Sequence, residues 1–356
     1  MRTLNTINGL VLSKFFNKPF YMHLYVTRKC NLRCRMCNVW RHADNKEMNV
    51  EEMKVAARKI KLLGTHQVVL TGGEPLLRSD IYEIISIFSE LGITTRLQTN
   101  ALLLNEEKLD RLIESGLSNL TISLHSLHNE RLNYIYGITS KAITDHIVKM
   151  LKLALKKMPD NMLVSNTVVS HYNLDELINI IKYSDFIGAW SAFVPVNLSV
   201  REDELFKAKA ADFVFTKEDK EKVEPIYLEI LQLKKQGYRI LDSTKFIQQS
   251  VNFIKTGRKK WKCDAGKLYY CIYPSGEFSA CDDFRGKMNI LDEDFTEKYF
   301  SKEYNEYLEN LQNNCQGCFY GCFREISSII HEPGMVVDRC VTLARIKKRN
   351  IFGWTS

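Results

Sequence analysis

Short apolar segments alternate with longer amphipathic segments along residues 20–200 of this chain. The short segments are β-branched or alternate apolar with polar residues, which is typical of strands buried in a sheet. We expect strands at residues 20–27, 67–71, 94–99, 119–124, 162–169 and 191–198. The amphipathic segments have apolar residues at i, i+3 and i+4 spacing, which is typical of helices. We expect helices at residues 50–63, 80–91, 106–115, 141–157 and 173–183.

The alternation of strands and helices predicts parallel strands that are covered by helices on the outside. Gly64, Gly92 and Gly116 stand where three of these helices should end. Six strand–helix units make an incomplete barrel or an open α/β sheet. In both folds the loops at the C-terminal ends of the strands build the site.

The length of 356 residues suggests two domains, at about 100–200 residues for each domain. Apolar residues make up 45% and charged residues 26%, which excludes a disordered or collagen-like chain. No apolar run reaches the roughly 18–20 residues of a membrane-spanning helix. The apolar segment at residues 9–16 is too short to span a membrane, and no small-residue cleavage site follows it, so we expect no signal peptide. We therefore expect a cytoplasmic protein without a membrane span.

The net charge of +8 comes from 50 basic and 42 acidic residues that are spread along the chain. Dense basic runs occur at residues 257–262 and 345–350, and solvated surfaces explain both. This distribution is weak evidence for an anionic partner, so no nucleic acid is expected.

Ten cysteines fall into two groups. The first group is Cys30, Cys34 and Cys37. The second group begins more than two hundred residues later and consists of Cys263, Cys271, Cys281, Cys315, Cys318, Cys322 and Cys340. Without an export signal, metal binding or chemistry explains such groups better than disulfides. Turn and charge signals near residues 235–260 predict a boundary between the groups. We divide the chain into an N-terminal segment (1–19), a core (20–235) and a cysteine-rich domain (236–356).

The first three cysteines directly follow the first expected strand, so they lie in a loop at the C-terminal edge of the sheet. Their C-x3-C-x2-C spacing lets one short loop wrap three thiolates around one face of an iron–sulfur cubane, which leaves one iron open. A structural zinc site would need a fourth ligand from the second group. The spacing favours the cluster, with zinc and free thiols as alternatives.

The second expected strand ends in the sequence TGGEP, from Thr71 to Pro75. Gly72 and Gly73 let the backbone come close to a ligand. Glu74 offers a carboxylate to an ammonium group, and Pro75 stiffens the turn. Alone this sequence is a common turn before a helix. It gains weight because it lies one strand away from the cysteine loop, at the same edge.

Together, CNLRCRMC and TGGEP resemble the cysteine triad and the SAM-binding turn of the radical S-adenosylmethionine (radical SAM) superfamily. The resemblance covers about residues 20–200 and includes the order of the strands. It implies a partial (β/α)6 TIM-like barrel, a [4Fe–4S] cluster on the three loop cysteines, and SAM bound at the open iron. It also implies that Gly72, Gly73, Glu74 and Pro75 bind SAM. One electron would then cleave SAM to methionine and a 5′-deoxyadenosyl radical, which takes a hydrogen atom from the substrate.

Other positions match the family less fully. Asn100 matches its polar strand end, Ser123 matches a serine that lies near SAM, and Asn166 is a candidate for ribose contact. The chain departs from the family at His125, where many relatives have aspartate, and at Tyr136-Gly137, where many have Arg-Gly. His125 is a candidate substrate group or a strand-end histidine that the backbone satisfies. Arg131 is the candidate replacement for the missing arginine at the SAM carboxylate, or a solvated helix residue.

The second group of cysteines surrounds the sequence YPSGEF, which predicts a hairpin turn. A hairpin brings cysteines from both strands to one side, and the later C-x2-C pair can bind the same metal. Taken alone, this tail suits iron–sulfur or zinc. Cys271 is also readable as a buried strand cysteine.

Behind such a barrel, the tail resembles the SPASM and twitch extensions of radical SAM enzymes, which bind auxiliary [4Fe–4S] clusters. The CDAG start, the C…G-x4-C segment and the C-x2-C pair carry this resemblance, although the final cysteine string is shortened. It implies a small α+β domain whose seven cysteines bind metal. Either two clusters form, one of them with an open iron or another ligand, or one twitch-type cluster forms. The single cluster would use Cys263, Cys281, Cys315 and Cys318.

The sequence therefore predicts a radical SAM enzyme that oxidises or joins bonds in a peptide or a small metabolite. The resemblance implies a flavodoxin- or ferredoxin-type electron donor. Only about 20 residues precede the first strand, so we expect no leader-binding or cobalamin domain. The alternatives are a dehydrogenase of a small hydroxylated metabolite and, more distantly, a zinc-stabilised nucleic-acid-binding protein.

Overall fold

The computed structural model describes residues 18–42, 46–159, 161–197, 211–258, 261–284, 286, 288–315, 317–332 and 334–351. Apart from its last two residues, the expected N-terminal segment lies outside this range, as does the expected last residue of the sixth strand, Leu198. Two residues of the basic run at 257–262 also lie outside it. Within the described part of the chain, no helix has the length and apolar character that crossing a membrane requires.

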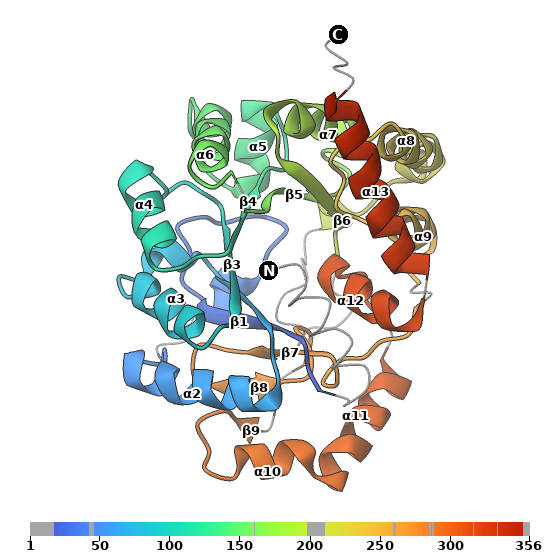
Figure 1. The fold of residues 1–356 in the computed structure, drawn as a ribbon. Coiled ribbons are helices and arrows are strands. Elements are labelled where there is room, and N and C mark those ends of the chain that lie inside the picture. Colours follow the sequence, from blue (N-terminus) through green and yellow to red (C-terminus); the bar gives the residue numbers. More distant parts are fainter. Residues whose placement is uncertain are drawn as a thin grey trace.

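Six parallel strands form the centre of the molecule (Figure 1). They are β1 (Tyr21–Thr27), β2 (Gln67–Gly72), β3 (Thr94–Thr99), β4 (Asn119–Ser123), β5 (Leu163–Val169) and β6 (Trp190–Pro195). Each strand pairs in parallel with the next one along the chain. This arrangement confirms the predicted partial TIM-like barrel, because parallel neighbours must be joined by crossovers through the helices.

Helices cover the outer side of these strands (Figure 1). The expected ones are α2 (Val50–Leu63), α3 (Ile81–Glu90), α4 (Glu106–Glu114), α6 (Ile143–Lys157) and α7 (Leu177–Ile187). Helix α5 (Asn129–Tyr136) is an addition to the expected set. Short 3-10 turns are η1 (Val39–His42), η2 (Pro75–Leu77), η3 (Leu174–Glu176) and η4 (Ala211–Phe213). Helix α2 begins with a capping box of Asn49 and Glu52 and ends at Gly64 in the left-handed conformation, which fixes its length.

The C-terminal part extends the same sheet. Its elements are α8 (Lys217–Lys235), α9 (Thr244–Thr256), β7 (Tyr269–Ile272), β8 (Glu277–Ser279), β9 (Met288–Asn289), α10 (Phe295–Phe300), α11 (Lys302–Asn314), α12 (Gly321–His331) and α13 (Gly334–Ile351). The strand order is β6-β5-β4-β3-β2-β1-β7-β8-β9. Strand β7 pairs in parallel with β1, and β8 pairs with β7 in antiparallel orientation. The predicted hairpin is therefore confirmed, and it places the cysteine-rich tail directly beside β1.

Strand β1 is buried along its whole length because both of its faces are covered. Its Met22, Leu24 and Val26 pack into the layer beneath the outer helices. Its Tyr21 and Tyr25 belong to a separate cluster with residues of the tail. Such two-sided burial explains why the strand reads as a nearly continuous apolar run.

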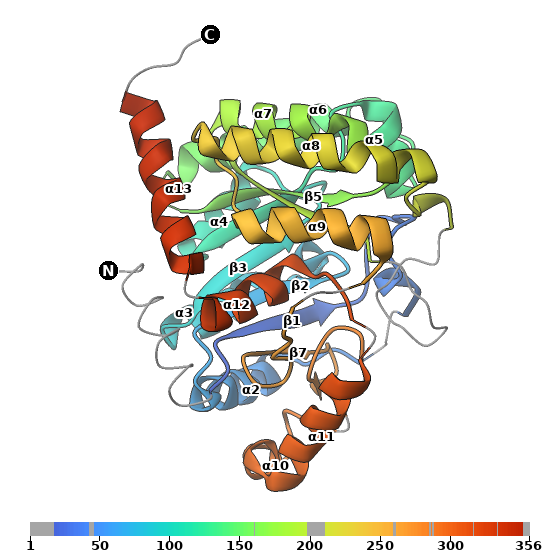
Figure 2. The same cartoon turned by 90° about the vertical axis from the view of Figure 1, so that its right-hand side faces the viewer.

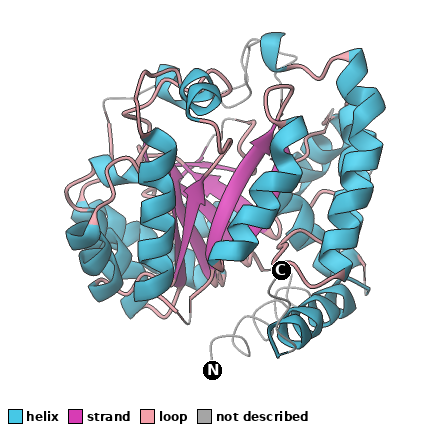
Figure 3. Ribbon diagram, turned by 90° about the horizontal axis from the view of Figure 1, so that it is seen from above, coloured by secondary structure: helices cyan, strands magenta, loops and turns pink. Residues whose placement is uncertain are grey.

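Helix α12 closes the open side of the arc of strands (Figure 1) and packs beside α9 (Figure 2). Its Phe323 stacks on Tyr269 of β7 with 4.3 Å between ring centroids. Seen from above in Figure 3, the strands stand inside a ring of helices. The tail thus supplies one wall of the barrel, and side chains on the inner face of β1 contact it.

Candidate metal and cofactor site

The cysteine loop begins where β1 ends, at the C-terminal edge of the sheet. Cys30, Cys34 and Cys37 are all partly exposed there. Burial, followed by the neighbouring Cys37 and Cys30, raises the pKa of Cys34 well above its ordinary value. Burial also raises the pKa of Cys37 to about 11. The three thiols are thus neighbours that stay protonated in the absence of a metal, and a bound metal would deprotonate them.

The spacing of these thiols bears on which metal group they fit. Zinc–sulfur bonds of about 2.3 Å would hold the sulfur atoms roughly 3.8 Å apart. Of the described residues, the only group of three or more metal-binding side chains within 4.8 Å of one another lies elsewhere in the molecule. The three loop thiols are therefore spread more widely than one zinc ion requires. An iron–sulfur cubane is larger than a zinc ion and each thiolate binds a different iron, so its ligands need not lie so close together.

The end of helix α5 supports the cysteine loop from one side. The N–H groups of Arg33 and Arg35 donate to the carbonyls of Tyr136 and Ile135, at 3.2 and 3.0 Å. A Cβ on Gly137, whose φ is +65°, would lie 2.4 Å from the carbonyl oxygen of Arg33. Gly137, which this chain shares with the family's Arg-Gly, therefore lets α5 approach the loop. Tyr136, which replaces the arginine, contributes a backbone carbonyl to the same contact.

The TGGEP turn supports the loop from the other side. A Cβ on Gly72 would lie 2.0 Å from the carbonyl oxygen of Thr27, and one on Gly73 would lie 2.1 Å from that of Lys29. The N–H groups of Gly73 and Glu74 donate to the same two carbonyls, each at 2.8 Å. The close approach that needs glycine is thus made by the chain's own cysteine loop, and the two motifs are built as one unit.

Glu74 lies at the centre of this unit and is fully buried. Its Oε1 accepts hydrogen bonds from Leu76 N–H at 3.0 Å and from Thr99 Oγ1–H at 2.8 Å. Its Oε2 accepts one from Asn100 N–H at 2.9 Å. Burial still raises the pKa of the carboxyl group, against the lowering by these bonds. Glu74 therefore holds the ends of β2 and β3 together, and Pro75 starts the η2 turn behind it.

Asn100 joins the end of β3 to the cysteine loop. Its Nδ2 donates to Asn31 Oδ1 at 2.8 Å, and its Oδ1 accepts from Leu102 N–H at 2.9 Å. Ser123 and Asn166 lie in register on β4 and β5, and both are partly exposed at the same edge. Every residue predicted to contact SAM therefore lies at this edge of the sheet.

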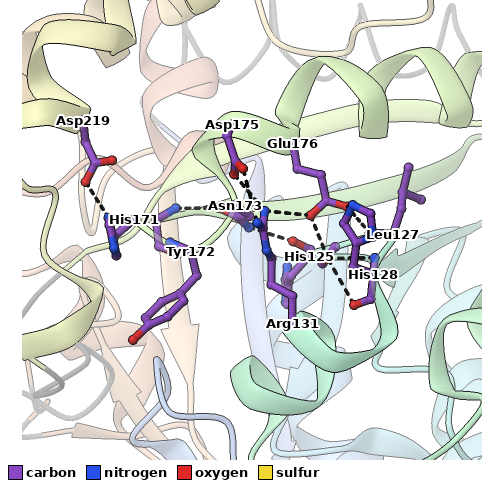
Figure 4. A network of polar contacts seen from close by, with 12 residues as sticks. His125, Leu127, His128, Arg131, His171, Tyr172, Asn173, Asp175, Glu176 and Asp219 are labelled. Carbon is purple, nitrogen blue, oxygen red and sulfur yellow. Dashed lines mark hydrogen bonds and ion pairs between the residues drawn. The ribbon is translucent and has the colours of Figure 1, made fainter.

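A polar network next to this edge contains the remaining predicted residues (Figure 4). His125 is buried, and its Nδ1 accepts a hydrogen bond from Val168 N–H at 3.1 Å. Burial lowers the pKa of His125 to about 3, so its ring is neutral. Asn173 Nδ2 donates to the His125 carbonyl at 2.8 Å. The interpretation of His125 as a strand-end histidine satisfied by the backbone is confirmed.

Arg131 is committed to the same network. Its guanidinium donates to both carboxylate oxygens of Asp175, at 2.7 and 3.2 Å, and to Glu176 at 3.2 Å. Glu176 in turn accepts from Ser126 Oγ–H and Leu127 N–H, at 2.7 Å each. Arg131 thus joins the segments that follow β4 and β5 (Figure 4). Its described partners are carboxylates of the protein itself, Asp175 and Glu176.

Four tail cysteines gather near Tyr269 and Phe323, at Cys263, Cys281, Cys318 and Cys322. Cys263 Sγ lies 3.1 Å from the Tyr269 hydroxyl oxygen. Burial first, then Asp283 and Cys318, raise the pKa of Cys281. These side chains come from the loop before β7, the segment after β8, the segment before α12 and the first turn of α12. The fold thus brings together thiols that are up to 59 residues apart in the sequence, between Cys263 and Cys322.

The other three tail cysteines lie in different surroundings. Cys315 follows α11, and its Sγ accepts a hydrogen bond from Gly317 N–H at 3.3 Å. Cys271 is fully buried on β7. Cys340 is exposed on α13, where no described contact links it to another cysteine. The structure therefore brings most of the predicted tail ligands together and sets Cys340 apart.

Sequence reasoning missed two side chains that contact this group. His23 and Asp282 form a buried ion pair, with 3.0 Å between Nδ1 and Oδ2. Cys271 donates to the other oxygen of Asp282 at 2.7 Å. A histidine inside the otherwise apolar and aromatic strand β1 was the only available signal, because 259 residues separate His23 from Asp282.

Comparisons with known proteins agree with this geometry. Residues 24–184 match the model of the radical SAM superfamily. A probable GTP 3′,8-cyclase of Archaeoglobus fulgidus is 35% identical over 162 residues, which cover 44% of this chain and 53% of the relative. The PqqA peptide cyclase of Bradyrhizobium diazoefficiens is 30% identical over 171 residues, which cover 48% and 44%. The chain thus spans about half the length of these curated relatives.

Solved structures share the fold over more of the chain. SuiB of Streptococcus suis, bound to its precursor peptide SuiA, has a TM-score of 0.63 at 16% identity. That similarity covers 86% of this chain and 70% of SuiB. The enzyme anSMEcpe, with AdoMet and the Cp18Cys peptide, has a TM-score of 0.60 at 15% identity and is covered to 99%, against 91% of this chain. At these identities the similarity establishes the fold.

Proposed function

Because residues 24–184 match the model of the radical SAM superfamily, we propose that this protein is a radical SAM enzyme that modifies a peptide with the help of an auxiliary cluster. The observation that carries the proposal is the single unit formed by the cysteine loop and the TGGEP turn. Gly73 and Glu74 donate to the backbone of that loop, so a group on the thiols would lie beside the turn.

Cys30, Cys34 and Cys37 would hold a [4Fe–4S] cluster, and Gly72, Gly73, Glu74 and Pro75 would line the SAM site with Asn100, Ser123 and Asn166. When bound, the cluster and SAM supply a 5′-deoxyadenosyl radical that removes a hydrogen atom from the substrate. Glu74 keeps room for one more hydrogen bond, because its Oε2 has a single described donor. A SAM ammonium is the charged donor that suits a buried carboxylate.

For the auxiliary group we propose one cubane held by Cys263, Cys281 and Cys318, which gather near Tyr269 and Phe323, and by Cys315, the other cysteine of the C-x2-C pair. Cys322, which also lies in this group, contacts His23 instead. The exposed position of Cys340 supports one cluster rather than two, because the three thiols left for a second cluster would be Cys271, Cys322 and Cys340. Trp261 Nε1–H donates to the Cys318 carbonyl at 3.2 Å, which fixes the C-x2-C loop against the segment that carries Cys263. An auxiliary cluster at this wall of the barrel would accept an electron from a substrate radical.

A peptide is the substrate class that we favour. The curated relatives match over the proposed SAM-binding domain. Radical SAM enzymes with different substrates share this domain, so that match does not indicate the substrate class. The solved relatives match through the tail as well, and two of them are described with bound peptides. Cyclisation of a nucleotide is the second candidate, because the probable GTP 3′,8-cyclase is 35% identical over the shared domain.

An acidic flavodoxin- or ferredoxin-type protein would supply the electron. Arg33, Arg35 and Arg41 are exposed on and directly after the cysteine loop. Arg33 and Arg41 lie over the ring of Trp40, at 5.0 and 4.4 Å from its centroid. A cationic surface above the thiols would steer an acidic donor to them, and the rate would fall as salt increases. Dithionite-driven reduction would lack that salt dependence.

The test is to replace Cys30, Cys34 and Cys37 together by Ala and to measure iron and 5′-deoxyadenosine after dithionite reduction. We expect a loss of about four irons and of all 5′-deoxyadenosine, while the tail keeps its iron. Cys340→Ala is the matched control and should change neither value. Continued 5′-deoxyadenosine formation in the triple variant would contradict the proposal. Coupled assays with peptides, GTP and hydroxylated metabolites then separate the substrate classes.

A further inference from the structure

We propose that His23, Cys271 and Asp282 form a second metal site, which binds one zinc ion inside the barrel and is separate from both iron–sulfur sites. Of the described residues, these are the only three metal-binding side chains whose ligand atoms all lie within 4.8 Å of one another. An imidazole, a thiol and a carboxylate are the ligand types that zinc takes in proteins.

The three side chains converge from separate parts of the chain. His23 lies on β1 directly opposite Cys271 on β7, in the register of the parallel pair. Asp282 follows β8, and its carbonyl oxygen accepts a hydrogen bond from the Tyr273 hydroxyl at 3.2 Å. Two ligands on neighbouring strands and a third on a fixed loop form a preorganised site, because sheet backbone holds positions more firmly than loops do.

The present distances are close to those that zinc needs. His23 Nδ1 lies 3.0 Å from Asp282 Oδ2, and Cys271 Sγ lies 2.7 Å from Asp282 Oδ1. With metal–ligand bonds of about 2.0–2.3 Å, a tetrahedral ion places its ligand atoms roughly 3.3–3.8 Å apart. Side-chain movements of about 1 Å or less would therefore open the site.

The second nitrogen of His23 has its own partner. Tyr21 Oη lies 3.1 Å from His23 Nε2, and Cys322 Sγ lies 3.5 Å from it. A metal-bound histidine usually has its other ring nitrogen fixed by such a partner, which sets the orientation of the ring. The Phe323 ring lies 4.9 Å from the His23 ring and closes the site on one side. This shell of aromatic side chains suits a closed structural metal site.

Charge and burial favour a divalent ion here. The exposed fractions of His23, Cys271 and Asp282 are 6%, 0% and 3%. A zinc ion with a neutral imidazole, one thiolate and one carboxylate has no net charge, so the loaded site avoids a buried excess charge. Binding releases two protons to solvent: the Cys271 thiol proton as the zinc–sulfur bond forms, and the Nδ1 proton of His23 that the ion pair with Asp282 holds in the metal-free site.

The experiment uses the full-length protein after anaerobic reconstitution with iron and sulfide, so that the cluster thiols proposed above are occupied. Zinc sulfate is then added, excess metal is removed, and zinc and iron are counted per chain. We expect one zinc in addition to the iron, and a higher melting temperature than in the protein without zinc. Cobalt in place of zinc should give an absorption band from the cobalt–thiolate bond.

The variants Cys271→Ser and Asp282→Asn should lose the zinc and the cobalt band and keep all iron. Cys340→Ala, an exposed tail cysteine outside the group, should keep both metals. Loss of about four irons in Cys271→Ser would overturn the proposal and make Cys271 a cluster ligand. If the unmodified protein takes up no zinc or cobalt, the three residues form a hydrogen-bonded group only. The radical SAM proposal is tested separately: it fails if Cys30, Cys34 and Cys37 bind no iron, whatever the zinc count.

Discussion

The two cysteine regions of this protein are held in place by different kinds of contact. The cysteine loop follows β1 directly, and backbone hydrogen bonds from the TGGEP turn and the end of α5 fix it. The tail cysteines come from segments that aromatic packing around Phe323 brings together. A loop held by backbone contacts tolerates side-chain changes but no added Cβ atom. A region held by side-chain packing is instead most sensitive to the loss of a buried side chain.

The largest effect that this comparison predicts follows from Gly73→Ala. The new Cβ would lie 2.1 Å from the carbonyl oxygen of Lys29, a backbone atom that cannot move aside cheaply. We expect the variant to lose about four irons and all SAM cleavage, while the tail iron stays. Iron analysis and 5′-deoxyadenosine formation measure both effects.

Gly92→Ala is the matched control for that prediction. Gly92 lies between α3 and β3, has a φ of +68°, and has open space where its Cβ would be. The left-handed conformation should cost roughly 1–2 kcal/mol of stability without loss of iron. Equal losses of iron in both variants would mean that steric fit against the cysteine loop is not the cause.

The second prediction tests the tail. Phe323→Ala removes a buried ring that packs on Tyr269, and it should lower the free energy of unfolding by about 3–5 kcal/mol. We expect tail iron to be lost first on warming, while the first cluster and uncoupled SAM cleavage persist. Phe300→Ala is the control, because Phe300 is half exposed in the same region and its loss should cost little. Simultaneous loss of both clusters on warming would contradict a separate support for each region.

The same contrast explains what the sequence predicted. The strands β1–β6 and their helices follow from periodicities of 2 and 3.6 that are complete within each segment. The cysteine loop and the TGGEP turn are local motifs on neighbouring strands, so their proximity was predictable as well. Strands β7 to β9 have two to four residues each, which is too short for a periodicity. The pairing of β7 with β1 and the contact of His23 with Asp282 depend on tertiary structure, which no local pattern records.

Two details at the predicted site also depended on tertiary structure. The glycines of TGGEP were expected to let the backbone approach a ligand, and the structure adds that they let it approach the cysteine loop. Arg131 was a candidate partner for a SAM carboxylate, yet Asp175 and Glu176 from the β5 loop engage it. In both cases the residue type was informative, and the partner lay in a segment that sequence spacing could not identify.

The third prediction concerns Glu74, whose carboxylate serves both the loop unit and the proposed SAM ammonium. A charge-assisted hydrogen bond contributes about 1.5–3 kcal/mol, so Glu74→Gln should weaken SAM binding by about one to two decades with iron intact. The amide would also face the Asn100 N–H, which should lower stability. Thr99→Val is the control, because it removes one donor to Glu74 and keeps the charge. It should lose stability and keep its SAM affinity. Unchanged SAM affinity in Glu74→Gln would refute the assignment.

The last prediction is an effect of pH on stability, at Asp242, where the tail helices meet the core. Its Oδ2 accepts from Phe193 N–H of β6 at 2.8 Å, and the charged groups that face it are Lys234 of α8, Glu325 of α12 and Arg339 of α13. Burial, followed by Glu325, raises the pKa of Asp242 to about 7. The charged form is therefore disfavoured in the folded state, so stability falls as the pH rises from about 4 to 7. The slope is about 1 kcal/mol per pH unit, and it vanishes above pH 7.

Asp242→Asn keeps the acceptor for Phe193 and should remove this slope, which urea unfolding between pH 5 and pH 8 measures. A parallel pH dependence in both proteins would show that Asp242 ionises normally and that the tail docks without a buried protonated carboxyl group.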